Sequence, residues 1–62
     1  MGYGAMDARD WENACDNIRN NNAVLNNYKE DAEKAHQNLP GYQFWGIAKR
    51  YGISDLIEQL LR

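Results

Sequence analysis

The chain has 62 residues and a mass of 7.2 kDa, with 26% charged residues and a formal net charge of −2 at pH 7. A domain of this length buries roughly 60% of its unfolded surface, so it needs tight helical packing or a further chain. The single cysteine, Cys15, excludes an internal disulfide, and one histidine with one cysteine excludes an ordinary zinc site within one chain. The acidic balance, with a pI of about 5.1, is unlike that of most nucleic-acid-binding domains.

The first residues lack the marks of a targeting or membrane signal. Residues 1–6 have neither the basic region nor the apolar stretch of a signal peptide, and their glycines predict a flexible lead. No run of ~18 apolar residues follows that could cross a membrane. We therefore expect a single helical domain over 7–62, in the cytoplasm, where a lone thiol stays reduced.

A helical pattern begins at Asp7. Apolar side chains from Trp11 to Leu39 recur at helical spacing on one slowly drifting face, which predicts one long helix over about 7–38. The asparagine run 20–22 opposes this continuity, because each asparagine costs roughly 0.6 kcal/mol of helix propensity relative to alanine. The apolar stripe nevertheless keeps its phase across the run, which a loop would not preserve.

Two short helices are predicted after Pro40, because proline disfavours helical geometry in the residue before it. The first covers about 42–51, with Gly52 as its C-terminal cap. Ser54 has the side chain of an N-cap, and apolar residues then recur with the spacing of one helix face over about 54–62. The chain is therefore predicted to be all-α.

The helix lengths predict self-association. A helix over 7–38 would be about 48 Å long, whereas the two short helices laid end to end span about 31 Å. Part of the apolar stripe would remain exposed to solvent in a single chain, so we expect a homodimeric helical bundle. A compact monomer of four short helices is the alternative if the asparagine run breaks the long helix. The predicted dimer seam consists of side chains from the stripe: Trp11, Cys15, Ile18, Asn22 and Leu25.

The sequence offers little catalytic chemistry. Glu33 and His36 form the Glu-x-x-His pair of di-iron bundles, but no further carboxylate faces them, so no metal site is expected. Ser54 is the only serine and threonine is absent, and neither a catalytic triad nor a phosphate loop can be assembled. We therefore expect neither an enzyme nor a cofactor.

Two groups of side chains are candidates for binding another protein. Tyr42, Trp45 and Lys49 share one face of the 42–51 helix, with Arg50 beside them, and such residues dominate binding hot spots. Trp45 and Lys49 are also spaced for a cation–π contact, although Trp45 could instead close the core. The second group is acidic and lies in the opening turns of the first helix: Asp7, Asp10, Glu12 and Asp16.

These observations indicate a small non-enzymatic protein-binding module: an adaptor, inhibitor or modulator, of phage or mobile-element type, that acts sterically through a helical surface. Its partners would be a second copy of the chain and an unidentified protein. The alternative is a DNA-binding regulator with a degenerate helix-turn-helix in residues 44–61, in which Ala48 and Gly52 have the expected spacing. The exposed positions of its second helix have the wrong charge for phosphates: Asp55, Glu58 and Gln59.

Overall fold

The computed structural model describes residues 6–62, and this part of the chain is all-α, as the sequence predicts. Its elements in chain order are α1 (Ala8–Asn20), the 3₁₀-helix η1 (Asn22–Tyr28), α2 (Lys29–Asn38), α3 (Gly41–Arg50) and α4 (Ser54–Leu60). The flexible lead expected over 1–6 lies outside the described residues except for Met6, which packs against the core.

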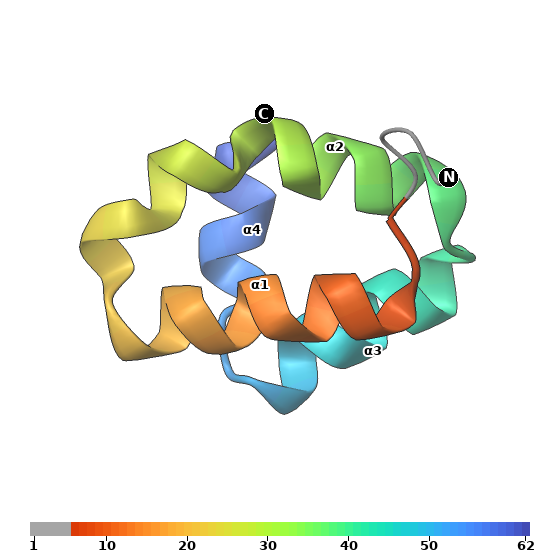
Figure 1. Ribbon diagram of the computed structural model, residues 1–62, viewed down its shortest axis with the longest axis horizontal. Helices are drawn as coiled ribbons and strands as arrows, with labels where there is room; N and C mark the ends of the chain where they lie inside the picture. Colours follow the sequence, from red (N-terminus) through yellow and green to blue (C-terminus); the bar gives the residue numbers. More distant parts are fainter. Residues whose placement is uncertain (1–5) are drawn as a thin grey trace.

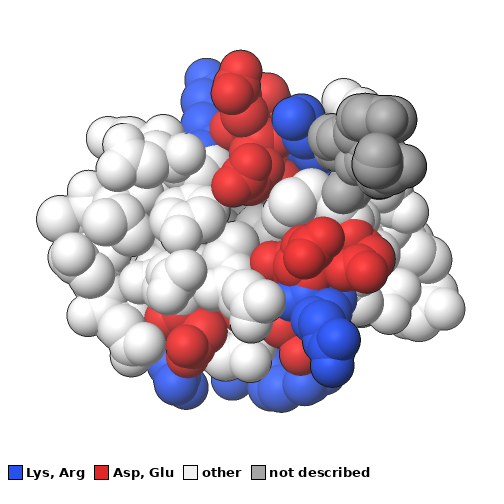
Figure 2. All heavy atoms as spheres, in the orientation of Figure 1, with Lys and Arg blue, Asp and Glu red and all other residues white. Residues whose placement is uncertain are grey.

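The helices enclose a single core. α1 and α2 run in opposite directions and are joined at one end of the molecule by η1, while α3 crosses α1 (Figure 1). α4 packs against α3 and η1 and lies between α1 and α2 in this view. The molecule measures 29 × 22 × 21 Å. Residues 20–28, where α1 gives way to α2, include no charged side chain, and Figure 2 shows this end of the face without Lys, Arg, Asp or Glu.

The continuous helix expected over 7–38 is replaced in this structure by α1, η1 and α2. Asn21 ends α1 because its backbone is extended, with φ −151° and ψ 93°. Its side-chain oxygen accepts a hydrogen bond from the backbone N–H of Ala23 at 3.2 Å, which caps η1. Asparagine favours such local bonds over helix continuation. The two halves of the apolar stripe therefore face each other across the core.

The boundaries of the last two helices agree with the prediction to within two residues. α3 covers Gly41–Arg50 and α4 covers Ser54–Leu60. Ser54 is not the N-cap that we expected: it is the first helical residue, and Ile53 precedes it without a side-chain capping bond. The side chain of Ile53 is buried in the core. Its packing, rather than a capping hydrogen bond, stabilises the start of α4.

Gly52 ends α3 as predicted. Its φ of 73° is in the left-handed region, which glycine adopts without the steric penalty of a side chain. The backbone N–H of Gly52 donates to the carbonyl of Lys49, and that of Ile53 donates to the carbonyl of Ala48, both at 3.0 Å. This pair of bonds is a Schellman motif, and it directs the chain from α3 into α4.

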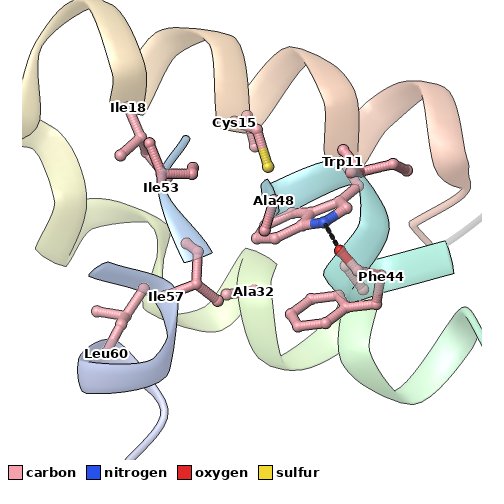
Figure 3. Close-up of a cluster of buried hydrophobic side chains, with 12 residues drawn as sticks. Trp11, Cys15, Ile18, Ala32, Phe44, Ala48, Ile53, Ile57 and Leu60 are labelled. Atoms are coloured by element: carbon pink, nitrogen blue, oxygen red, sulfur yellow. Dashed lines mark hydrogen bonds between the residues drawn. The ribbon is translucent and has the colours of Figure 1, made fainter. Parts of the chain in front are cut away.

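The core is built around the contact between α1 and α3. Trp11, Cys15 and Ile18 point inward from α1 toward Phe44 of α3 and the apolar side chains of α4 (Figure 3). The indole N–H of Trp11 donates a hydrogen bond to the backbone carbonyl of Phe44 at 3.0 Å. The two rings stack with centroids 4.7 Å apart and an angle of 11° between their planes. Every α-helix contributes buried residues, whereas η1 contributes none.

Candidate functional site

An open pocket of about 270 Å³ lies between α1 and α3. Glu12 forms its α1 side, and the α3 side consists of residues that recur at helical spacing: Tyr42, Gln43, Gly46, Ile47 and Arg50. Gly46 leaves part of the hollow open, since a Cβ built on it would have nothing within 4 Å. Ile47 supplies a buried apolar surface at the base of the helix face. The pocket therefore combines an apolar floor with the charged side chains of Glu12 and Arg50.

Glu12 and Arg50 meet across this pocket and join the two groups of side chains that the sequence singled out. Nη1 of Arg50 lies 3.5 Å from Oε2 of Glu12, with the two side chains 65% and 35% exposed. An ion pair that is this open to water contributes at most about 1 kcal/mol to stability. A guanidinium has five N–H donors, so Arg50 keeps donors that face solvent after it has paired with Glu12.

Tyr42 stands at the rim of the pocket. Among residues 6–62 it is the one large hydrophobic side chain that stays exposed, at 83%. Lys49 is exposed on the neighbouring face of α3 and does not line the pocket. An exposed tyrosine beside a hollow and an arginine is the composition typical of a binding hot spot.

Trp45 lies on the other flank of α3 and belongs to the edge of the core. Its ring meets the edge of Phe44 with centroids 4.9 Å apart and approaches His36 at 6.1 Å. The side chain is half-buried, as expected if it closes the core. Within the described residues the cation–π contact found is between Arg19 and Tyr51, and the predicted pair of Trp45 with Lys49 does not form.

The four acidic side chains at the start of α1 have different contacts and do not form one site. Asp7 is the N-cap of α1, and its Oδ1 accepts a hydrogen bond from the backbone N–H of Asp10 at 2.9 Å. Asp10 is exposed in the first turn, where a negative charge suits the helix dipole. Asp16 pairs with Arg19 at 3.0 Å. Only Glu12 of this group lines the pocket.

The residues of the predicted dimer seam are divided between core and surface. Trp11, Cys15 and Ile18 are completely buried by the chain's own helices, so a second copy could contact them only if these helices separated. Leu25 is half-buried, and Asn22 is exposed. Within the single chain, the apolar side chains of this seam are therefore covered by the other helices of the same core.

The remaining chemical groups are arranged as follows. Burial raises the pKa of the Cys15 thiol to about 12, and the charge of Glu12 adds to this shift, so the thiol stays protonated and unreactive at neutral pH. Glu33 and His36 are both exposed, and the His36 ring meets Phe44 edge-on at 4.8 Å. No three His, Cys, Asp or Glu side chains of residues 6–62 come together as metal ligands.

α3 and α4 follow one another as a helix-turn-helix would. The outer face of α4 exposes Asp55, Glu58 and Gln59, and Glu58 pairs with Arg62 at 3.4 Å. This face carries acidic groups where a DNA-reading helix needs basic ones. None of the helices in the described part of the chain has the length and apolar character needed to cross a membrane.

The fold and the pocket together define a small all-helical domain with one exposed aromatic-basic helix face. No protein family, curated protein or solved structure matches the chain at a significant level. Of the pocket residues, Glu12, Tyr42 and Arg50 were among the binding residues predicted from the sequence, whereas Gln43, Gly46 and Ile47 were not. The sequence pattern that could have indicated Gly46 is its i, i+4 spacing between Tyr42 and Arg50, which places the three residues on one helix face.

Proposed function

We propose that this protein is a non-enzymatic protein-binding module that captures an acidic segment of another protein on the exposed face of α3. The observation that carries the proposal is Tyr42, which is 83% exposed at the rim of the α1/α3 pocket. An aromatic side chain held in water costs hydrophobic free energy that its burial against a partner would recover.

The charge distribution supports an acidic partner. α3 carries Lys49 and Arg50 and no acidic residue. Since the whole chain has a net charge of −2 and α3 contributes +2, the remainder carries −4. An acidic segment would be attracted to α3 and repelled by the rest of the surface, which fixes where and how it docks.

The pocket supports a specific mode of contact. An apolar side chain of the partner fits over Gly46 and against Ile47, where the helix has no side chain in the way. A neighbouring carboxylate of the partner would take the solvent-facing donors of Arg50 and compete with Glu12 for them. Tyr42 would cover the contact from the rim. Binding of this kind blocks or bridges the partner by occupying its surface.

Site-specific photocrosslinking in cells that produce the chain tests this proposal. A photoreactive benzoylphenylalanine replaces Tyr42, and in a matched protein it replaces Asn26, which is exposed in η1. We expect one discrete protein adduct from position 42 and none from position 26. The adduct from position 42 should fall at least about ten-fold with Arg50→Glu, because the charge that attracts the partner is reversed.

Arg62→Glu is the control for this charge reversal, since Arg62 is also an exposed arginine paired with a glutamate. It should leave the adduct unchanged. Equal adducts at both positions, no adduct at all, or an adduct indifferent to Arg50→Glu would each contradict the proposal. Retention on duplex DNA that falls steeply with salt, with no discrete protein adduct, would favour the DNA-binding alternative.

A further inference from the structure

The connection between α1 and α2 has an uncommon backbone. η1 (Asn22–Tyr28) is a 3₁₀-helix of seven residues, whereas such helices rarely exceed about 3–4 residues because their hydrogen bonds are poorly aligned. None of its residues is fully buried, and it follows the extended residue Asn21. A long 3₁₀ segment within a helical pattern often marks a hinge or a strained sequence. Leu25 and Tyr28 of η1 pack against the edge of the core, so opening at this hinge would also break those contacts.

The sequence on both sides of this hinge suits one continuous helix. The apolar residues of α1 and α2 keep the phase of a single α-helix from Trp11 to Leu39. A straight helix over residues 8–38 would be about 46 Å long at 1.5 Å per residue. The longest dimension of the molecule is 29 Å, so a chain in this form could not fold back to cover its own core.

α1 can leave the core as one unit, since only the hinge connects it to the rest of the chain. Its buried side chains, with Trp11 and Ile18 among the largest, would then be exposed. The same opening would leave a gap over Phe44 in the remaining helices. A second copy opened in the same way offers an α1 that fits this gap, because the contacts are those of the closed chain.

We propose that this protein forms a domain-swapped dimer in which α1, η1 and α2 join into one helix and α1 of each copy fills the core of the other. In such dimers the two hinge segments meet near the two-fold axis. Residues 20–28 carry no charged side chain, and on the face shown in Figure 2 this end is free of Lys, Arg, Asp and Glu. Two copies can therefore meet there without repulsion between like charges.

The swap changes the composition of the α1/α3 pocket. Glu12 reaches the pocket from α1, while Arg50 and the other lining residues belong to α3. In the dimer each pocket would therefore pair Glu12 of one copy with Arg50 of the other. The dimer would present two identical pockets, one for each copy, at a separation set by the long helix.

One single and one double variant at the start of η1 test the hinge. Asn22 is the first residue of η1, where proline is favoured because its missing N–H lies outside the hydrogen-bond ladder, and the extended Asn21 suits the residue before a proline. Asn22→Pro therefore fits the closed chain but breaks a continuous helix. Asn22→Ala, combined with Asn21→Ala, removes the η1 cap and favours the continuous helix.

Light scattering over a concentration series measures the result, on protein refolded at high concentration so that opened chains can exchange. We expect a wild-type mass that rises toward twice 7.2 kDa. The double alanine variant should have a dimer dissociation constant roughly ten-fold lower. Asn22→Pro should keep the mass of one chain at every concentration while it retains its helical circular dichroism.

A mixed-label NMR experiment separates a swapped dimer from two closed chains side by side. Labelled and unlabelled chains are refolded together, and contacts between copies are selected. A nuclear Overhauser effect between the Trp11 indole of one copy and the Phe44 ring of the other supports the swap. A dimer without this contact overturns it. So does a mass of one chain for both the wild type and the double alanine variant, or dimerisation that Asn22→Pro does not weaken.

Discussion

The indole of Trp11 and the ring of Phe44 stack at 4.7 Å while the same indole donates a hydrogen bond to the Phe44 carbonyl at 3.0 Å. Trp11 therefore connects α1 to α3 twice, by ring stacking and by the hydrogen bond of its indole N–H. Both residues are fully buried, so water does not compete for the hydrogen bond. This double contact fixes the distance between the two helices that form the pocket.

Trp11→Phe should lower the free energy of unfolding by about 2–3 kcal/mol. The change removes the hydrogen bond and leaves a small cavity, and each effect contributes about 1 kcal/mol or more. This loss is about half of the roughly 3–5 kcal/mol that a domain of this size has. Urea denaturation followed by circular dichroism measures it. Trp45→Phe is the control, and its effect should be smaller since Trp45 is only half-buried.

Gly52→Ala should destabilise the chain by about 1 kcal/mol, because an alanine at a φ of 73° is strained. No atom lies within 4 Å of the added Cβ, so the loss comes from the backbone alone. Thermal unfolding would show it as a lower Tm. Equal stability of Gly52→Ala and the wild type would contradict the Schellman motif.

Gly46→Ala should have the opposite effect on stability and should weaken binding. Gly46 lies inside α3 and its added Cβ also meets nothing within 4 Å, so the gain in helix propensity is about 0.5–1 kcal/mol. The methyl group enters the pocket where the partner's apolar side chain would sit. A higher Tm together with a weaker photocrosslink from benzoylphenylalanine at position 42 would separate the two effects. A higher Tm with an unchanged crosslink would place the partner elsewhere.

The free energy of unfolding should fall between pH 9.0 and about 12 because of Cys15. The pKa of its thiol is raised from 9.0 to about 12 in the folded chain, so above pH 9.0 the unfolded chain loses this proton while the folded chain keeps it. This contribution to stability is intact below pH 9.0 and decreases through the window. Cys15→Ala should show a shallower decrease in urea denaturation at pH 8 to 11, and an unchanged slope would contradict the shift.

Asp7→Ala should reduce stability by about 1 kcal/mol through loss of the α1 cap. Asp7→Asn keeps an oxygen that can accept from the backbone N–H of Asp10, so it should retain most of that stability. Thermal unfolding of the pair measures the difference. If both variants lose the same amount, the charge of Asp7 rather than its hydrogen bond stabilises the helix.

Local patterns in the sequence were enough to predict the helical class and the helix ends near Leu39 and Gly52. Proline and glycine act through the backbone of their immediate neighbours, so their effect can be predicted without knowledge of the fold. The inward faces of α1 and α4 could also be predicted, because apolar spacing at 3.6 residues per turn determines which side needs burial.

The turn at Asn21 and the complete pocket could not be predicted in this way. A stripe in constant phase is compatible with one helix covered by a second chain and with two helices that cover each other, because both arrangements bury Trp11 and Ile18 equally. The choice depends on packing between distant segments. Glu12 and Arg50 likewise meet only because the Trp11–Phe44 contact brings α1 against α3.

The different burial of the two tryptophans gives the protein its own pair of optical reporters. Trp11 is completely enclosed, so its fluorescence emission will lie at short wavelength and resist quenching by acrylamide. Trp45 is half-buried on α3, so its emission will lie at longer wavelength and respond to the quencher. Unfolding would expose both indoles to water, so the two emissions would then coincide at long wavelength.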